Sequence, residues 1–308
     1  MGRQTLGQLH HLGMDITYLS RKRLPDGPSL SPVIGERSVV SNKIENTFFD
    51  AILDFTAYQV AEVQQTLSTV KTNHYILISS AWVTQKETGI RKFSTLENRY
   101  VSNKIAIERF LMANANKDVD VTIIRFPIVL GFNDHSGRLN YLTRRILRSQ
   151  PITICRDITG PCSFVCVQDA AKLITSYVLR LKPGVSRIID ALPPQDIEYK
   201  YFLNLIGLAC HKDVKTIEAD QKEIQKWFPQ FFEVDPFWRE RPYPIKNHNA
   251  FDEVKVNVAS YRSWLPQALK FAGDEAETLI GKTSKRPWNN VKFLASEKKW
   301  CDWQYDDV

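Results

Sequence analysis

A tyrosine and a lysine four residues apart are the residues of this chain whose types and spacing best suit chemistry. Tyr100 and Lys104 lie in a stretch with the pattern of a helix, and four residues make about one helical turn, so both side chains share one face. A phenol with a pKa near ~10 is a poor acid or base at neutral pH, but a nearby ammonium group lowers that pKa. Tyr100 could then exchange a proton with a substrate hydroxyl or carbonyl. The same spacing also occurs on solvated helices, so the surrounding elements must decide between the two interpretations.

A predicted strand adds a hydroxyl group to this pair. Residues 74–80 are mostly apolar, with β-branched side chains, and end in Ser79 and Ser80. Such a run is typical of a buried parallel strand whose carboxyl end opens into a site. Ser80 is then placed to hydrogen-bond the substrate oxygen that Tyr100 protonates. The sequence predicts Ser80, Tyr100 and Lys104 as catalytic residues.

Four segments together resemble a known family. They are Ser79–Val83, Tyr100–Lys104, Ile124–Gly131 and Phe164–Ala171. In their order and spacing the chain resembles the extended short-chain dehydrogenase/reductase superfamily, in its branch of NAD(P)-dependent nucleotide-sugar epimerases and dehydratases. The resemblance implies an α/β fold: a Rossmann-like doubly wound parallel sheet with a smaller, mixed C-terminal substrate lobe. The alternation of apolar strands with amphipathic helices also favours a parallel sheet with right-handed crossovers.

This fold predicts two domains. We expect residues 1–190 to form the dinucleotide-binding domain, which is incomplete at its amino terminus, with residues 132–163 contributing to the substrate side. Residues 191–308 are expected to form the substrate lobe. The lobe is rich in aromatic residues, which we interpret as its own core.

The beginning of the chain departs from the family pattern. Residues 2–13 predict a helix with Leu6, Leu9 and Leu12 facing inward and Gly13 as its end, followed by a strand at residues 14–19. In the superfamily this helix follows the first strand of the sheet, and Gly2 matches the third glycine of its Gly-x-x-Gly-x-x-Gly turn. The first strand and the first two glycines are not found here.

The departure bears on cofactor binding, because those glycines let the backbone approach the pyrophosphate of a dinucleotide. We therefore expect binding to be impaired. The first strand normally lies between the second and the fourth, so its absence should leave two inner sheet edges unpaired. Two interpretations stay open: a strand and glycine turn lie upstream in the natural protein, which the family spacing of residues 2–21 favours, or another segment fills the gap.

The resemblance also implies a set of cofactor-binding residues. Arg21 and Lys22 follow the second predicted strand, where relatives that bind NAD usually carry a carboxylate. A guanidinium suits the 2′-phosphate of NADP, so NADP is expected rather than NAD. The alternative is a pair of surface cations. The full set that the resemblance implies is Gly2, Arg3, Arg21, Lys22, Phe55, Thr56, Ala57, Lys104, Pro127 and Ile128.

Predictions for the substrate side rest on fewer features. Residues 84–98 are polar and predict a loop over the site, and Asp169 is expected to be the N-cap of a helix. The dehydratase branch needs an Asp-Glu pair after its strand-end hydroxyl, and Ala81-Trp82 stands there instead, which argues against a dehydratase. The candidate substrate-binding residues are Trp82, Asn133, Arg138 and Arg145.

Composition bounds the remaining possibilities. The chain has 308 residues, a net charge of +7 and no apolar run long enough to span a bilayer, nor the apolar core of a signal peptide. A cytoplasmic protein is expected, with no membrane partner. The positive charge favours a phosphorylated or nucleotide-linked small molecule over nucleic acid. Its five cysteines form no C-x-x-C pair, which favours free thiols and no metal site. A homodimer is compatible with the sequence.

Two functional hypotheses from different classes remain. The first is an NAD(P)-dependent oxidoreductase or epimerase that acts on a sugar nucleotide or similar hydroxyl/carbonyl substrate through Ser80, Tyr100 and Lys104. The second is a non-catalytic relative that shares the fold and binds RNA or a nucleotide. The Tyr100/Lys104 pair favours the first hypothesis, whereas the missing strand and the net positive charge leave room for the second.

Overall fold

The computed structural model describes residues 1–24, 27–37, 43–90, 93, 95–115, 119–131, 138–156, 160–220, 222–224 and 249–269. Contacts between residues divide the chain into two units. Unit 1 comprises Met1–Val129, Val167–Leu192 and Tyr243–Asn257, and unit 2 comprises Leu130–Cys166, Pro193–Pro242 and Val258–Val308. The predicted domain boundary after residue 190 stays a prediction.

Helices and strands alternate through the first half of the chain. In chain order the elements are α1 (Gly2–His11), β1 (Ile16–Ser20), β2 (Leu30–Ile34), β3 (Phe48–Asp54), α3 (Val60–Thr69), β4 (Lys71–Ser80), α4 (Trp82–Glu87), α5 (Thr95–Asn114), β5 (Asp120–Phe126), β6 (Ile128–Leu130), α6 (Arg138–Leu147), β7 (Ile152–Cys155), β8 (Pro161–Cys162), β9 (Phe164–Cys166), α7 (Val167–Val178), β10 (Arg187–Asp190), β11 (Ile197–Glu198), α8 (Tyr199–Ala209), β12 (Thr216–Ala219) and α11 (Ala250–Glu253).

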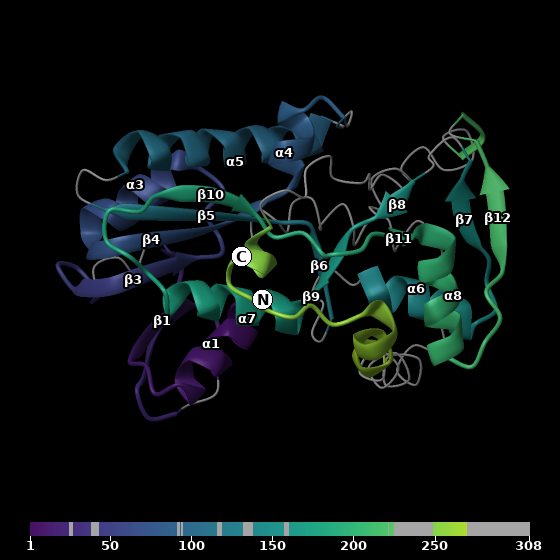
Figure 1. The fold of residues 1–308 in the computed structure, drawn as a ribbon, viewed down its shortest axis with the longest axis horizontal. Helices are drawn as coiled ribbons and strands as arrows, with labels where there is room; N and C mark the ends of the chain where they lie inside the picture. Colours follow the sequence, from purple (N-terminus) through teal and green to yellow (C-terminus); the bar gives the residue numbers. More distant parts are fainter. Residues whose placement is uncertain are drawn as a thin grey trace. The chain divides into compact units, whose positions relative to one another are not determined.

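Unit 1 is built on a four-stranded parallel sheet with the order β10-β5-β4-β3 (Figure 1). The register pairs Ser79 with Arg125 and Ser80 with Phe126, so the polar end of β4 lies beside the end of β5. Helices α3 and α5 cover one face of this sheet, and α1 and α7 pack together on the other (Figure 1). The predicted Rossmann-like α/β fold is confirmed.

The core under α3 and α5 forms because β4 and β5 are apolar along most of their length. Tyr75 and Leu77 of β4 meet Ile107 and Leu111 of α5, and all four side chains are buried. Burying each such side chain contributes about 1.5–3 kcal/mol relative to leaving it in water. This packing holds α5 on the sheet, and α5 carries two of the predicted catalytic residues.

Strands β1 and β2 form a separate two-stranded parallel sheet, with Ile16 opposite Leu30. In the described part of the chain, β1 pairs only with β2 and β3 only with β4, so each keeps one unpaired edge. This is the arrangement expected when the strand between them is missing. Phe48, the first residue of β3, is 55% exposed, and only Asp54 of that strand is buried.

Three local predictions were wrong. Leu12 does not face inward: it is the C-cap of α1, beyond the last turn, and is 53% exposed, although Gly13 does end the helix with φ 74°. Residues 84–98 do not form one loop, because α4 continues to Glu87 and α5 begins at Thr95. Asp169 is not an N-cap, because α7 begins two residues earlier; its carboxylate lies buried in the first turn and accepts a hydrogen bond from Lys172 at 2.9 Å.

Unit 2 has its own core and its own small sheets. β12 pairs in parallel with β7, and β11 pairs antiparallel with β8. The rings of Phe164 and Phe202 lie 4.7 Å apart between centroids, and Tyr261 donates a hydrogen bond to the carbonyl of Phe164 at 3.2 Å. Within the described residues, none of the helices combines the length and the apolar character that crossing a bilayer requires.

Candidate active site

Lys104 lies at the centre of the candidate site. Its side chain is buried beneath α5, and its Nζ donates to the carbonyl of Ala57 at 2.9 Å and to that of Ile78 at 3.2 Å. These carbonyls belong to the loop after β3 and to the last part of β4, so the ammonium lies at the carboxyl edge of the sheet. In the described part of the chain, no carboxylate forms an ion pair with it.

Burial lowers the pKa of Lys104 to about 8, because a charged ammonium loses its hydration there. Asp54 and Glu108 act in the opposite direction, but from beyond ion-pair distance, so they do not compensate fully. The charge of Lys104 is therefore held by carbonyl dipoles and distant carboxylates rather than by a paired anion. The pKa of such an ammonium group depends strongly on its hydration and on nearby charges.

Tyr100 lies one turn before Lys104 on α5, as predicted. The Lys104 ammonium is 6.0 Å from the centroid of the Tyr100 ring and 5.1 Å from that of Tyr58. The ring of Trp82 meets Tyr100 edge-on at 6.0 Å, and Phe93 lies 6.1 Å from Trp82. Three further aromatic rings, those of Tyr58, Trp82 and Phe93, therefore lie near the pair. An ammonium near these rings is favoured electrostatically.

Ser80 ends β4, and its Oγ accepts a hydrogen bond from the backbone N–H of Trp82 at 3.3 Å. The backbone N–H of Ala81 donates to the carbonyl of Phe126 at 2.8 Å, which fixes the turn from β4 into α4 to the end of β5. Trp82 therefore begins a helix directly after the strand. The structure places Ser80 and Trp82 at the same edge of the sheet as Lys104.

Several of the predicted cofactor residues form one neighbourhood in unit 1. A Cβ atom placed on Gly2 would lie 3.6 Å from the ring of Phe55, so the first turn of α1 lies beside the loop after β3. In that loop, the backbone N–H of Thr56 donates to Asp54 at 2.9 Å, and Ala57 accepts from Lys104. The amino terminus of a helix, with its unpaired N–H groups and positive dipole end, suits an anionic pyrophosphate.

The other predicted cofactor residues have different environments. Arg21 and Lys22 follow β1, Arg21 half-buried and Lys22 exposed, and the N–H of Lys22 is bonded to the Ser20 hydroxyl at 3.3 Å. Arg3 is exposed on α1. Pro127 and Ile128 are buried after β5.

Two of the candidate substrate residues belong to a different unit from Trp82, which lies in unit 1. Arg138 and Arg145 lie on α6, which belongs to unit 2. The guanidinium of Arg145 donates through Nε to the carbonyl of Pro151 at 2.9 Å, so it already holds the end of its own helix. Asn133 lies outside the described residues.

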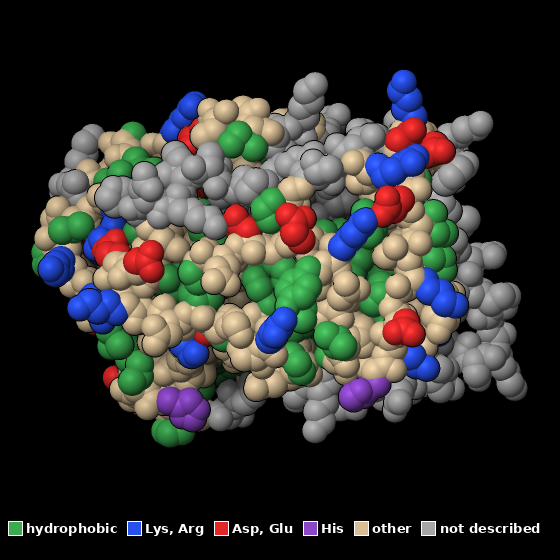
Figure 2. Space-filling view, turned by 45° about the vertical axis from the view of Figure 1, so that its right-hand side comes forward, with side chains coloured by type: hydrophobic (Ala, Val, Ile, Leu, Met, Phe, Trp, Pro, Cys, Tyr) green, Lys and Arg blue, Asp and Glu red, His purple; other side chains and the backbone are tan. Residues whose placement is uncertain are grey.

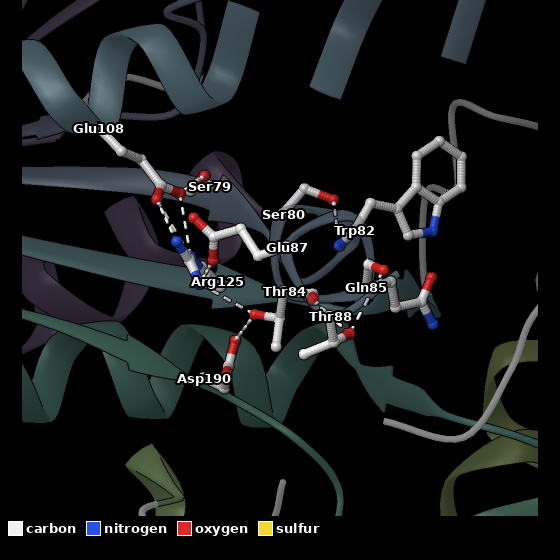
Figure 3. Close-up of polar contacts among 10 residues, drawn as sticks. All are labelled: Ser79, Ser80, Trp82, Thr84, Gln85, Glu87, Thr88, Glu108, Arg125 and Asp190. Atoms are coloured by element: carbon white, nitrogen blue, oxygen red, sulfur yellow. Dashed lines mark hydrogen bonds and ion pairs between the residues drawn. The ribbon is translucent and has the colours of Figure 1, made fainter. Parts of the chain in front are cut away.

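Sequence reasoning missed a buried polar cluster around Arg125, drawn in Figure 3. The guanidinium donates to Glu108 at 2.6 Å, and to Thr84 and Glu87 at 3.0 Å each. Ser79 also donates to Glu108. The only sequence signals were a Ser and an Arg inside otherwise apolar strands, and a Glu one turn after Lys104.

A second missed cluster lies at the end of β3. Arg37 forms an ion pair with Asp54, which also accepts a hydrogen bond from Tyr75, and Arg37 donates to Thr66 at 2.8 Å. Burial alone would raise the pKa of the Asp54 carboxyl, but Arg37 outweighs it and holds that pKa below its usual range.

The comparisons with known proteins agree with this arrangement. The model of the NAD dependent epimerase/dehydratase family matches residues 38–189. This range includes Ser80, Tyr100 and Lys104, and all residues of the Arg125 cluster except Asp190. This match, over nearly half of the chain, agrees with the predicted resemblance to the extended short-chain dehydrogenase/reductase superfamily. No curated protein in the comparison matches the sequence.

Several solved structures share the fold at low sequence identity. The epimerase Mth375 from Methanothermobacter thermautotrophicus has a TM-score of 0.69 at 14% identity, covering 92% of this chain and 91% of its own. UDP-glucuronic acid 4-epimerase from Bacillus cereus, in complex with NAD, has a TM-score of 0.68 at 12% identity, covering 88% and 92%. MoeE5 in complex with UDP-glucuronic acid and NAD has a TM-score of 0.67 at 15% identity, covering 89% and 96%.

The face of the molecule shown in Figure 2 carries charges of both signs. On the face shown in Figure 2, Lys and Arg side chains are interspersed with Asp and Glu side chains rather than gathered in one block. The described basic side chains on this face therefore form no single block. Such a distribution raises the local concentration of anionic small molecules only weakly.

Proposed function

We propose that this protein is a nicotinamide-dinucleotide-dependent epimerase or oxidoreductase that acts on a hydroxyl or carbonyl group of a sugar nucleotide. The observation that carries the proposal is Lys104, a buried ammonium without an ion-pair partner in the described residues, one helical turn from Tyr100. A structural lysine would be paired or exposed. This one is kept charged where it stabilises a neighbouring phenolate.

The proposed roles follow from the positions of the three side chains. Tyr100 accepts the proton of the substrate hydroxyl as a phenolate, or donates it back to the carbonyl oxygen. Lys104 stabilises the phenolate through its charge, and its third N–H remains for a ribose hydroxyl of the cofactor. Ser80 donates a hydrogen bond to the reacting oxygen. When bound, the dinucleotide exchanges a hydride at C4 of its nicotinamide.

The residues of unit 1 fit such a dinucleotide. The first turn of α1 at Gly2 and the loop from Phe55 to Ala57 would hold the pyrophosphate end, and Lys104 would hold the ribose next to the nicotinamide. We further propose that NADP is preferred to NAD, because Arg21 and Lys22, rather than a carboxylate, follow β1. Two of the solved structures named above contain NAD, so this preference is the finer part of the proposal.

The test of the proposed function is Tyr100→Phe, with Tyr58→Phe as the matched control. Both variants remove one phenolic oxygen and keep the ring beside Lys104. We expect Tyr100→Phe to lose at least about 10²-fold in kcat with UDP-glucose or UDP-glucuronic acid as probes, since it removes the proton acceptor. Tyr58→Phe should stay within about threefold of the parent protein. Equal rates for parent and Tyr100→Phe would refute the catalytic assignment.

A further inference from the structure

One guanidinium connects the two sides of the candidate site. Arg125, at the end of β5, bonds Glu108 on α5 and both Thr84 and Glu87 on α4. Thr84 in turn donates to Asp190 at the end of β10 at 2.9 Å. Figure 3 shows these side chains converging on Arg125 from separate elements. The cluster therefore ties α4, α5, β5 and β10 together at the carboxyl edge of the sheet.

The cluster reaches the candidate catalytic residues through short, rigid connections. Tyr100, Lys104 and Glu108 follow one another at four-residue intervals, so they form one stripe along α5. Glu108 also accepts a hydrogen bond from Ser79, the neighbour of Ser80. A shift of α5 at Glu108 would therefore move Tyr100 and Lys104 relative to Ser80. A misplacement of about 1 Å can cost about 10²-fold in rate when reacting groups must be aligned.

The contacts of Arg125 suit this task better than simple stabilisation. The guanidinium is planar and presents its N–H groups in a fixed fork, so it specifies directions as well as a charge. Nε donates to Glu108 at 3.1 Å, while NH1 reaches Thr84 and Glu87 on another helix. A single-point cation such as lysine could neutralise Glu108 but could not fix both helices. Buried ion pairs contribute little net stability on average.

We propose that Arg125 is a positioning residue for the reaction, and that it sets the register of α5 against the Ser80 end of β4 through Glu108. This inference rests on the proposed function of Tyr100, Lys104 and Ser80. Arg125 acts through these residues and does not contact the substrate.

The test compares Arg125→Lys with Thr122→Val. Thr122 lies on the same strand as Arg125, is also buried, and bonds the His74 ring at 2.8 Å towards the other end of β4 and β5. Thr122→Val therefore loses a buried polar contact of the same sheet without touching the site. Melting temperature, kcat and KM are measured for both at a temperature where both are folded. Thr84→Val, which removes one arm of the cluster and no charge, is measured alongside and replaces Arg125→Lys if that variant does not fold.

We expect Arg125→Lys to lower kcat about tenfold or more, with KM within about threefold, whereas Thr122→Val lowers only the melting temperature. In the Tyr100→Phe background, Arg125→Lys should change the residual rate less than about twofold, because there is no longer a proton acceptor to align. Parent-like kcat in Arg125→Lys, or fully additive losses in the double variant, would overturn the proposal.

A second readout does not depend on turnover. Acetic anhydride labelling of Lys104, followed by mass spectrometry across a pH series, reports the titration of its amine. The charged groups that face it are Asp54, Glu108, Glu62 and Arg37. If Arg125 fixes α5, its substitution lets water reach Lys104, and the titration midpoint rises by at least about half a pH unit. Thr122→Val should leave the midpoint unchanged, and equal midpoints in all variants would overturn the positioning role.

The two readouts separate the two proposals. If Tyr100→Phe keeps parent-like turnover, the proposed function fails, but the labelling of Lys104 still shows whether Arg125 positions α5. If Tyr100→Phe is inactive and the Lys104 midpoint does not move in Arg125→Lys, the function stands and the positioning role is refuted.

Discussion

Lys104 and Arg125 are buried cations at the same edge of the sheet, and they are held in opposite ways. Burial would lower the pKa of Arg125, but its hydrogen bonds and ion pairs with Glu108, and its ion pair with Glu87, outweigh burial and raise that pKa. Burial of Lys104 prevails, and its pKa falls to about 8. The charge of Arg125 is paired with carboxylates, whereas the charge of Lys104 is held by backbone carbonyls.

The Arg37–Asp54 pair belongs to the same class as Arg125 and offers the strongest way to break the comparison. Arg37→Met leaves the Asp54 carboxylate buried without its cation, so the free energy of unfolding should fall by about 3–5 kcal/mol. Urea unfolding at pH 7 measures it. The double variant Arg37→Met/Asp54→Asn should recover most of the loss. A loss below about 1 kcal/mol would show that Asp54 does not depend on its partner.

Lys104→Met tests whether burial destabilises the charge of Lys104. The folded state binds the Lys104 proton less tightly than the unfolded state, so the stability of the parent protein rises with pH between about 8 and the usual lysine pKa. Below about pH 8 the buried charge of Lys104 destabilises the folded parent protein most. There the removal of this charge in Lys104→Met should raise the free energy of unfolding by about 2–3 kcal/mol, and the loss of two hydrogen bonds should offset part of this gain.

This advantage should shrink as the pH rises towards 10, because the parent lysine then loses its charge. Urea unfolding of both proteins at pH 7 and pH 10 checks the sign. A stability difference that does not change with pH would mean that Lys104 is not strained by burial, and that the contrast with Arg125 is wrong.

Arg21 represents a third kind of cation, because it is only partly buried and directly follows β1. If it binds the 2′-phosphate, Arg21→Asp should lower the ratio of NADPH to NADH affinity by about tenfold, since a carboxylate repels that phosphate. Arg23→Asp, two residues later in the same exposed segment, is the matched control. Fluorescence titration with both reduced cofactors measures the ratio, and an unchanged value would assign Arg21 to the surface.

The smallest effect is expected at an ion pair that is exposed rather than buried. Arg156 lies 3.1 Å from Glu223, and both side chains are about half exposed. Water and salt screen such a pair, so Arg156→Gln should change the free energy of unfolding by less than about 0.5 kcal/mol. A loss comparable to that of Arg37→Met would show that burial does not separate these pairs.

Much of the fold could be predicted from the sequence, because helices and strands follow local patterns. The strand before Ser80, the helix carrying Tyr100 and Lys104, and the end of α1 at Gly13 are set by hydrophobic period, residue spacing and glycine conformation. The unpaired edges of β1 and β3 also follow from the predicted strand order. Prediction failed at residues 84–98, because this polar sequence resembles a loop. Its first part is helical instead, and Arg125 binds Thr84 and Glu87 there.

The sequence by itself determined the types and the one-turn spacing of Tyr100 and Lys104, since both depend only on neighbouring residues. Only the tertiary structure decided that Arg125 meets Thr84 and Glu108, and that Thr84 bonds Asp190, which lies 106 positions further along the chain. It also decided the low pKa of Lys104, because that value depends on burial and on carbonyls from two separate strand ends. Contacts of this kind depend on strand order and register, which no local pattern contains.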